Sequence, residues 1–304
     1  MKVLIIGYGS IGARHARLLS ELKCQAAVVS ERKVDFPKTY ASLAAALAVE
    51  QPSYIVIANA TSQHHDSLLA LAKFDYAGTV LVEKPVFSNW VDIKPLPFQS
   101  IFVGYNLRFH PIIKRLKLLL DGEQVLSVLA YVGQYLPDWR PDTDYRESYS
   151  ASAAKGGGVL RDLSHELDYL TWLLGGWKRV SALGGKFSQL EITSDDIYAL
   201  SIDTPACPIV TVQINYLDRL TRRFVLINTS NHTIEADFIK GVVRIDGEVE
   251  MIVTERDYTY NAMHEAVLTA NMDNLCTLKE GLEVMQLIES AELSAQRSGE
   301  WVVR

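Results

Sequence analysis

Short apolar runs alternate with stretches of helical apolar spacing through the first hundred residues of the chain. Near-continuous apolar runs suit parallel strands that are buried on both faces of a sheet. We expect such strands at 2–6, 26–29, 54–58, 79–82 and 101–103. Apolar positions spaced for one helix face predict helices at 11–22, 42–50 and 67–73. This order of elements is typical of an open, doubly wound parallel sheet of the Rossmann type.

The pattern changes after residue 106. Helices are expected at 110–120 and 158–174, and a long strand at 124–136. Short alternating strands then follow one another between residues 179 and 253, among them 209–215, 223–228 and 232–238. This density of strands without intervening helices predicts a mostly antiparallel open sheet in an α+β domain. The end of the chain is expected to be helical at 260–297, followed by a short strand at 300–303.

The chain is therefore expected to form two domains. Its 304 residues suit two units of ordinary size. Residues 1–106 are predicted to form a dinucleotide-binding domain. Residues 107–304 are predicted to form a domain for substrate binding and oligomerisation, with the C-terminal helix and tail packing back on the first domain.

Composition and charge exclude several classes of protein. Apolar residues make up 48% of the chain and charged residues 22%, which is ordinary globular usage. The net charge of −6, without a run of Lys or Arg, does not support nucleic-acid binding. No apolar stretch reaches the length of a membrane helix, and the first residues lack a signal-peptide pattern. Three widely spaced cysteines favour neither a disulfide framework nor a metal site, so we expect a soluble cytoplasmic protein.

A glycine-rich turn lies between the first expected strand and the first expected helix. Its residues are Gly7, Tyr8, Gly9, Ser10, Ile11 and Gly12. In the dinucleotide-binding fingerprint the first glycine permits a tight turn, the second lets the backbone approach a pyrophosphate, and the third allows close helix packing. The helix N-terminus supplies amide donors for the phosphates. This context predicts binding of NAD or NADP.

The residues after the second expected strand leave the choice of dinucleotide open. Glu31 suits a hydrogen bond to the adenosine ribose, which favours NAD. Ser30 in the place of that acid, with Arg32 beside it, suits the 2′-phosphate of NADP. Solvated loop residues are the third interpretation.

Four further segments accompany the glycine turn. Asn59, Ala60, Thr61 and His64 follow the third strand, and Glu83-Lys84-Pro85 closes the fourth. Gly156-Gly157-Gly158 precedes Asp162 and His165 in the second domain, and residues 104–111 join the two domains. Taken together and in order, these motifs resemble those of the glucose–fructose oxidoreductase / inositol dehydrogenase (Gfo/Idh/MocA) family. Glu83-Lys84-Pro85 is intact. The Thr-Pro-Asn turn of the family is replaced by Asn59-Ala60-Thr61, so only His64 and the position of the turn carry over.

This resemblance implies a set of site residues. The turn at Asn59, Ala60, Thr61 and His64, together with Glu83, Lys84 and Pro85, is expected to contact the cofactor. Lys84, Asp162 and His165 are expected to carry catalysis. Many members place the histidine four residues after the aspartate, and at that spacing Glu166 occupies the place. We favour His165, because a continuous helix would put Arg161, Asp162, His165, Tyr169 and Trp172 opposite its leucine stripe.

The chemistry of these residue types suits hydride transfer between nicotinamide and a secondary alcohol or ketone. A histidine takes up or releases the hydroxyl proton near neutral pH. Asp162 orients the imidazole, and the ammonium of Lys84 holds the reacting oxygen. The alternative for Lys84 is a surface lysine paired with Glu83, and that for His165 is an incidental surface histidine.

The substrate is expected to be a sugar, a sugar acid or a nucleotide-sugar, as the resemblance implies. Trp139 and Tyr145 in the loop after the long strand suit stacking on a sugar ring, and Arg140 favours an anionic group. Arg108 and Arg161 would add to the same clamp. A loop that packs only on a neighbouring domain or subunit is the alternative interpretation.

Two other functions are compatible with the fold. One is an NAD(P)-binding sensor without turnover, and the other is a reductase of imines or tetrapyrroles. Neither needs the aspartate–histidine pair. A homo-oligomer, a dimer or tetramer, is also expected through the open sheet face, with Val212, Ile214 and Leu226 among its candidate apolar residues.

Overall fold

The computed structural model of the chain describes residues 1–139 and 142–304. Contacts divide these residues into two compact units. Unit 1 contains Met1–Phe109 and Arg256–Leu282, and unit 2 contains His110–Glu255 and Glu283–Arg304. The unit that carries the glycine turn thus also takes in a segment from near the end of the chain.

Unit 1 is built on a seven-stranded sheet, sheet A, with the strand order β15-β6-β5-β4-β1-β2-β3. All neighbours pair in parallel except β15, which runs antiparallel to β6. The strands are β1 (Lys2–Ile6), β2 (Gln25–Val29), β3 (Thr39–Tyr40), β4 (Tyr54–Ile57), β5 (Thr79–Val82), β6 (Ser100–Val103) and β15 (Cys276–Thr277). The helices are α1 (Ser10–Glu21), α2 (Leu43–Glu50), α3 (His64–Lys73) and α7 (Tyr258–Leu268), with short 3₁₀ turns at Thr61–Gln63 and Asn106–Phe109. The predicted doubly wound parallel sheet is confirmed.

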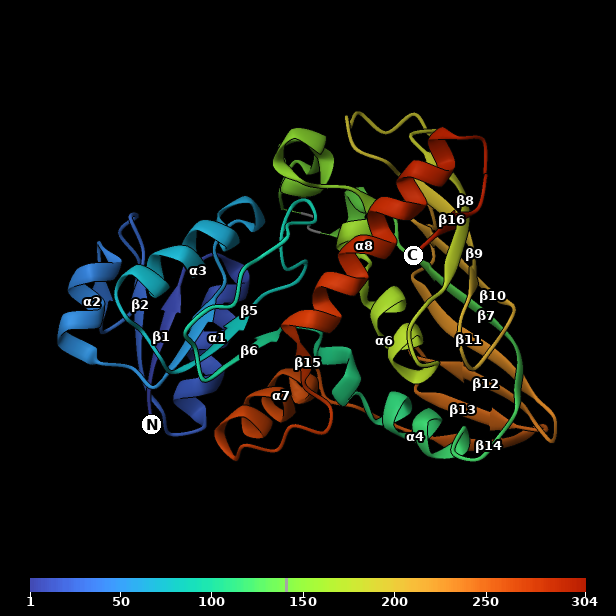
Figure 1. Cartoon of the computed structure of the whole chain (residues 1–304), viewed down its shortest axis with the longest axis horizontal. Helices are drawn as coiled ribbons and strands as arrows, with labels where there is room; N and C mark the ends of the chain where they lie inside the picture. Colours follow the sequence, from blue (N-terminus) through green and yellow to red (C-terminus); the bar gives the residue numbers. More distant parts are fainter. Residues whose placement is uncertain (140–141) are drawn as a thin grey trace. The chain divides into compact units, whose positions relative to one another are not determined.

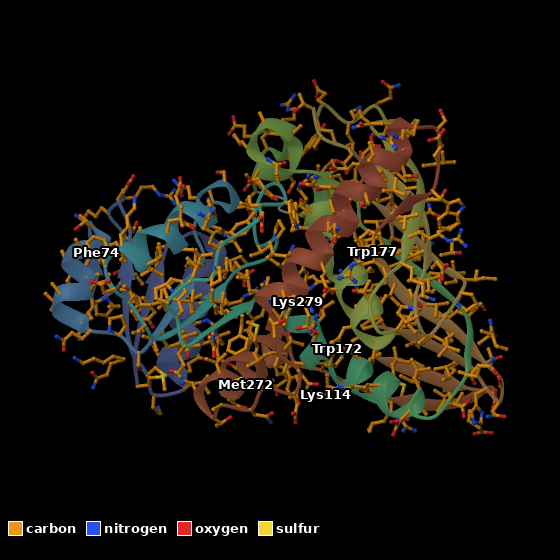
Figure 2. The ribbon with its side chains drawn as sticks, in the orientation of Figure 1. Phe74, Lys114, Trp172, Trp177, Met272 and Lys279 are labelled. Atoms are coloured by element: carbon orange, nitrogen blue, oxygen red, sulfur yellow. The ribbon has the colours of Figure 1, made fainter. Side chains whose placement is uncertain are left out.

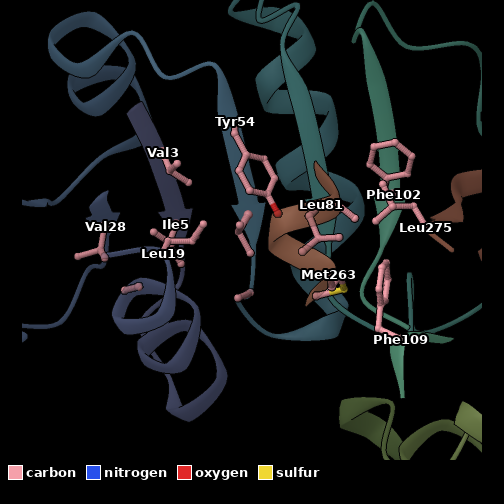
Figure 3. Packing of buried hydrophobic residues seen from close by; sticks show 14 residues of the cluster. Val3, Ile5, Leu19, Val28, Tyr54, Leu81, Phe102, Phe109, Met263 and Leu275 are labelled. Carbon is pink, nitrogen blue, oxygen red and sulfur yellow. The ribbon is translucent and has the colours of Figure 1, made fainter. Parts of the chain in front are cut away.

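One face of sheet A carries a core shared with helices α1 and α7. Alternate residues of β1, such as Val3 and Ile5, pack there with Leu19 of α1 and Met263 of α7 (Figure 3). The other face of sheet A is also buried at this strand, because every residue of β4 is buried. Burial on both faces explains why these strands read as unbroken apolar runs in the sequence.

The register of sheet A brings several loops to one edge. Ile6 pairs with Val29 and Ile57, and Ile57 pairs with Val82. The residues that follow these strands therefore leave the sheet at the same level. In open α/β sheets ligands bind at this carboxyl edge, near the strand where the chain order reverses. Strand β1 is that strand, since the chain continues to β2 on one side and to β4 on the other.

Unit 2 is built on a nine-stranded sheet, sheet B, with the order β14-β13-β12-β11-β7-β10-β9-β8-β16. Only β7 and β10 pair in parallel, so the predicted mostly antiparallel sheet is confirmed. Its strands are β7 (Val125–Gly133), β8 (Arg179–Gly185), β9 (Ile197–Asp203), β10 (Val210–Asn215), β11 (Arg222–Thr229), β12 (Thr233–Asp237), β13 (Val242–Ile245), β14 (Glu248–Met251) and β16 (Val302–Val303). Figure 1 shows helix α6 (His165–Leu173) beside this sheet. The C-terminal tail, expected on the nucleotide domain, instead adds β16 to sheet B.

The remaining elements of unit 2 are short, apart from one long helix. They are the helices α4 (Pro111–Leu119) and α5 (Val159–Asp162) and 3₁₀ turns at Leu136–Trp139, Tyr145–Glu147, Tyr149–Ala151 and Ala153–Lys155. The long helix α8 (Leu278–Gln296) contributes its residues from Glu283 onward to this unit.

The residues on the open face of sheet B differ from those expected. Val212 and Ile214 are fully buried, so they belong to the inner face of the sheet. Leu226 lies on the other face, where it pairs in register with the exposed Leu129. The rings of Tyr131 and Phe224 stack beside them with centroids 5.5 Å apart. The alternation along β10 was assigned to the wrong face, because a two-residue period does not say which side the helices cover.

The helix expected at 158–174 is two helices. Helix α5 ends at Asp162 and α6 begins at His165. Ser164 donates its hydroxyl to the carbonyl of Arg161 at 3.0 Å, and such a local bond competes with helix continuation. The expected face is therefore not one surface. Arg161 and Tyr169 are buried, whereas Asp162 and His165 are partly exposed.

Trp172, on the same expected face, lies beside helix α4 of its own unit. The ammonium of Lys117 stands 4.2 Å from the centre of the Trp172 ring. Figure 2 labels Trp172 together with Lys114, another lysine of α4. The contact is of the cation–π kind. Trp172 therefore takes part in packing within unit 2.

His110 is expected to make the folding stability of unit 2 depend on pH. Its Nδ1 accepts the Ile112 amide at the start of α4, and burial, with Arg223 nearby, lowers its pKa from 6.5 to about 4. Between these values the unfolded chain binds a proton that the folded chain does not, so stability is full above pH 6.5 and falls as pH decreases. We expect His110 to contribute a loss of about 2 kcal/mol between pH 7 and pH 5.

Urea denaturation of wild type and His110→Asn at both pH values measures this contribution. Asparagine retains a capping acceptor but has no proton to gain. The variant should lose less stability than wild type over this interval. Equal losses in the two proteins would show that His110 does not cause the pH dependence.

Candidate active site

The glycine turn in unit 1 has the geometry of a phosphate cradle. Gly7 has φ +94°, and a Cβ there would lie 2.6 Å from the backbone of Asn59. A Cβ on Gly12 would lie 2.1 Å from the carbonyl oxygen of Gly7. A Cβ on Gly9 would meet nothing within 4 Å, although Gly9 caps the N-terminus of α1. The turn thus packs tightly at its two ends and leaves open space at the helix N-terminus.

Two other residues of the turn are Tyr8 and Ser10. The ring of Tyr8 packs against Phe36 with centroids 5.7 Å apart, and its hydroxyl donates to the Asp35 carbonyl. Ser10 begins α1 and Ile11 follows it. Tyr8 is thereby fixed against the segment that follows β2.

The end of β2 presents all three candidates for the ribose. Ser30 is half-buried, and its hydroxyl both accepts the Arg32 amide and donates to the Arg32 carbonyl. The side chains of Glu31 and Arg32 are exposed, and neither forms an ion pair among the described residues. Both charged groups are therefore available to a ligand.

His64 connects two loops of the carboxyl edge. Its Nδ1 lies 3.2 Å from the Pro85 carbonyl and 3.1 Å from that of Val86, and its Nε2 lies 3.3 Å from the Asn59 carbonyl. Burial lowers the pKa of His64, which keeps the ring neutral. The ring is only 1% exposed, so it supports the loops from beneath and offers no surface to a cofactor.

The turn that His64 supports contains three other residues expected to contact the cofactor. The Asn59 amide donates to the Ser67 hydroxyl at 2.9 Å, which ties the turn to α3. Ala60 and Thr61 follow, and Thr61 opens the 3₁₀ turn before α3.

Glu83-Lys84-Pro85 lies at the end of β5. The Glu83 carboxylate is buried and accepts both the Lys84 amide, at 3.1 Å, and the His15 ring, at 2.9 Å. The Lys84–Pro85 peptide bond is cis. Lys84 is partly exposed, at the same edge of the sheet as Gly7. His15 of α1 is therefore a direct partner of this motif.

In unit 2 a buried tyrosine holds Asp162. The Tyr216 hydroxyl donates to Asp162 Oδ2 at 2.6 Å. Burial and the Asp162 charge raise the pKa of Tyr216 far above its usual value, so Tyr216 remains a donor. The ring of Trp139 meets that of Tyr216 edge-on at 5.2 Å, and its indole N–H donates to the Gln134 carbonyl. Sequence reasoning missed Tyr216, because it lies far from Asp162 along the chain.

Asp195 is a second residue that sequence reasoning missed. Its Oδ2 accepts the amides of Val159, at 2.8 Å, and Leu160, at 3.4 Å, which caps α5. A Cβ on Gly158 would lie 2.2 Å from Asp195 Oδ1, so the glycine makes room for this carboxylate. Burial, with Glu292 nearby, raises the pKa of Asp195 to about 6. The glycine triplet thus shapes the start of α5.

The alternatives for the histidine position have different surroundings. Glu166 is fully buried, and its carboxylate forms an ion pair with Arg223 of β11 at 2.8 Å. His165 is partly exposed at the first position of α6. Glu166 therefore anchors α6 to sheet B, and His165 is the residue of the two that a ligand can reach.

Two expected substrate-binding arginines are committed to ion pairs. Arg108 is 1% exposed and pairs with Glu280 at 3.0 Å within unit 1. Arg161 is buried and pairs with Glu292 within unit 2. Their charges are balanced inside the units, which corrects the expectation that they form an anion clamp. Spacing along the sequence gave no sign of these partners.

The loop that follows β7 is partly described. Tyr145 is half-buried, and its hydroxyl accepts the Glu191 amide at 3.2 Å. Arg140, expected to meet an anionic substrate group, lies outside the described residues. The described ranges contain no group of three or more His, Cys, Asp or Glu side chains able to hold a metal ion. No helix in these ranges is long and apolar enough to cross a membrane.

Comparisons with known proteins agree with this architecture. Residues 1–96 match a model described as the oxidoreductase family with an NAD-binding Rossmann fold, and residues 113–235 match the GFO/IDH/MocA C-terminal domain. Together these matches cover more than half of the chain. The chain belongs to the Gfo/Idh/MocA family of oxidoreductases, and its first unit is an NAD-binding Rossmann domain.

Individual relatives are distant. Levoglucosan dehydrogenase of Pseudarthrobacter phenanthrenivorans is 24% identical over 144 residues, which cover 44% of this chain and 37% of that protein. The crystal structure of GenD2 from gentamicin A biosynthesis in complex with NAD has a TM-score of 0.80 at 20% identity, over 100% of this chain and 96% of that one. WlbA dehydrogenase from Bordetella pertussis, in complex with NADH and UDP-GlcNAcA, has a TM-score of 0.82 at 16% identity, over 100% and 97%. These two likenesses show the fold.

Proposed function

We propose that the protein is an NAD(P)-dependent dehydrogenase acting on a secondary alcohol or ketone of a sugar, sugar acid or nucleotide-sugar. The observation that carries this proposal is the register of sheet A. It puts Lys84 and the glycine turn at one edge, two strands apart. Dehydrogenase names among the relatives, including levoglucosan dehydrogenase and UDP-N-acetylglucosamine 3-dehydrogenase, support the substrate class.

The residues of the turn fit the dinucleotide. The open space at Gly9 and the α1 amides would hold its pyrophosphate, and Ser30, Glu31 or Arg32 its adenosine ribose. When bound, the nicotinamide supplies the hydride chemistry. The protein must then orient the substrate and handle its hydroxyl proton.

We assign the proton step to unit 2. His165 takes the substrate hydroxyl proton in oxidation and returns it in reduction. The Asp162 carboxylate, fixed by Tyr216, favours the charged imidazolium. Lys84 holds the reacting oxygen with its ammonium and stabilises negative charge on that oxygen. Trp139 and Tyr145 are proposed to contact the sugar.

The proposal is tested by cofactor reduction with a panel of sugars, sugar acids and nucleotide-sugars. Turnover with at least one member at the expense of NAD or NADP supports it. Tight cofactor binding without turnover of any panel member would favour a sensor. Turnover of an imine or tetrapyrrole alone would favour the other reductase class.

Tyr216→Phe tests the role of Asp162. Removing the hydroxyl leaves the buried ring in place but frees the carboxylate. We expect kcat to fall about 10-fold, with the KM for cofactor unchanged, since a hydrogen bond to a charged group contributes about 1.5–3 kcal/mol. Tyr198→Phe, at another buried tyrosine of unit 2, should be neutral. Equal activity of the two variants would remove Tyr216 from the site.

Arg32→Ala tests the choice of dinucleotide. If Arg32 meets a 2′-phosphate, its loss should weaken NADPH binding by about 10-fold or more and leave NADH binding within about 2-fold. Titration of NADH and NADPH by fluorescence measures both. A variant that binds the two cofactors as wild type does would leave Glu31 as the ribose ligand.

A further inference from the structure

Four buried polar side chains form a chain of hydrogen bonds beneath the cofactor edge of unit 1. The members are Tyr54 of β4, His264 of α7, His15 of α1 and Glu83 after β5. The first three are fully buried, and Glu83 is 7% exposed. Tyr54 OH lies 3.0 Å from His264 Nδ1, His264 Nε2 lies 2.8 Å from His15 Nδ1, and His15 Nε2 lies 2.9 Å from Glu83 Oε1. Figure 3 shows the Tyr54 ring extending toward helix α7.

The protons of this chain have one consistent arrangement. The Tyr54 hydroxyl has His264 as its only hydrogen-bond partner within the described residues, so its proton belongs on that bond. His264 Nδ1 then accepts, and its Nε2–H donates to His15 Nδ1. The remaining His15 proton lies on Nε2 and points at the Glu83 carboxylate. Every donor has an acceptor, and both rings are neutral.

The reverse arrangement is disfavoured. It needs either a doubly protonated His15 or a protonated Glu83, and it leaves the Tyr54 hydroxyl proton without an acceptor in a buried place. Burial also lowers the pKa of His264 and raises that of Tyr54, so a neutral imidazole and an intact phenol agree with the arrangement above.

The far end of the chain reaches the Glu83-Lys84-Pro85 turn. Glu83 uses its second oxygen, Oε2, to accept the backbone N–H of Lys84 at 3.1 Å. Gly104, which follows β6, makes room for this carboxylate, since a Cβ there would lie 2.8 Å from Glu83 Oε1. The orientation of one carboxylate thus sets the backbone from which the Lys84 side chain starts.

We propose that His15 and His264 are positioning residues. The Tyr54 hydroxyl donates to His264 and thereby sets the tautomers of both rings, so that His15 Nε2–H donates to Glu83 and the Lys84 backbone is fixed. Neither histidine belongs to the glycine fingerprint or to the Glu83-Lys84-Pro85 motif. This chain of hydrogen bonds also links helix α7, which comes late in the sequence, to β4 and α1 of unit 1. Its catalytic consequence rests on the proposed function, whereas the hydrogen bonds themselves do not.

The test is NMR of the whole protein labelled with ¹⁵N-histidine and, separately, uniformly with ¹⁵N. Ring ¹⁵N shifts in the cofactor-free protein report which nitrogen of His15 and His264 carries the proton, with assignment by single replacement. We expect the Nε2–H form at both. Tyr54→Phe removes only the first hydroxyl, so it should change the His264 tautomer and move the Lys84 amide resonance upfield.

Two variants complete the comparison. Gly104→Ala, which displaces the carboxylate directly, should move the same Lys84 amide. Tyr76→Phe is the matched control, since this buried hydroxyl of unit 1 donates to the Thr79 carbonyl and contacts neither histidine. It should leave all these signals in place.

The result that would overturn the proposal is a His15 proton on Nδ1, or a Lys84 amide that Tyr54→Phe does not move. If the protein is a dehydrogenase, Tyr54→Phe should lower kcat by about 10-fold or more relative to Tyr76→Phe, because misplaced catalytic groups cost such factors. The expected tautomers in a protein without any turnover would refute the proposed function and leave the hydrogen-bond chain standing.

Discussion

Replacing Lys84 by Met or His165 by Ala should lower kcat/KM by about 100-fold to 10,000-fold, the range that general acid–base and oxyanion-stabilising groups contribute. Methionine retains much of the lysine side chain but has no charge. Both changes remove groups that are partly exposed, so little stability should be lost. Steady-state kinetics on a substrate found in the sugar panel measures the effect.

Each of these variants has a matched control in its own unit. Lys73→Met removes an exposed lysine at the end of α3, and His232→Ala removes an exposed histidine whose partner is Asp246. Both controls should keep activity within about 2-fold, as expected for surface changes away from the site. If the Lys84 and His165 variants behave like these controls, the assignment of the site is wrong.

The double variant, Lys84→Met with His165→Ala, tests whether the two residues act on the same step. Groups that act on one oxygen and its proton lose most of their joint effect when either is removed. The double variant should therefore be little slower than the slower single variant. Multiplied losses would indicate that the two residues act on separate steps.

Alanine at Gly9 and at Gly12 should separate cofactor binding from folding. A Cβ at Gly9 meets open space, and its extended backbone suits alanine, so stability should change by less than about 0.5 kcal/mol. That Cβ would nevertheless occupy the approach to the pyrophosphate. We expect NADH affinity to fall at least about 10-fold, a loss of about 1.4 kcal/mol.

Gly12→Ala should have a different effect. Its Cβ would lie 2.1 Å from a backbone oxygen, and no side-chain rotation can relieve that clash. We expect a loss of about 1–3 kcal/mol or more in stability, together with loss of binding. Urea denaturation and NADH titration on both variants measure the pair. A Gly9→Ala variant that binds NADH as wild type does would show that the pyrophosphate does not bind at the glycine turn.

The fold was predictable because its signals are local and repeated. Unbroken apolar runs such as β4 indicate strands buried on both faces, and the change to alternating strands after residue 106 indicates the second sheet. The glycine turn was predictable for the same reason. The spacing of the motif predicts the steric roles that the structure shows for Gly7 and Gly12.

Sequence reasoning missed one local feature and several contacts between residues that are distant in the chain. The helix at 158–174 breaks because one serine hydroxyl bonds back to Arg161, a local competition that apolar spacing does not reveal. The pairing of Arg108 with Glu280 joins residues far apart in the chain. The same holds for the chain from Tyr54 to Glu83, whose members come from four separate elements.

In the proposed function, Lys84 and His165 act on the same substrate oxygen. A crystal structure of the protein with NAD and a sugar identified by the panel is the decisive experiment. We expect Lys84 Nζ and one imidazole nitrogen of His165 each to lie within about 3.2 Å of the hydroxyl oxygen that loses its proton. A complex in which either nitrogen lies beyond hydrogen-bonding reach of that oxygen, with no water between them, would show that this assignment is wrong.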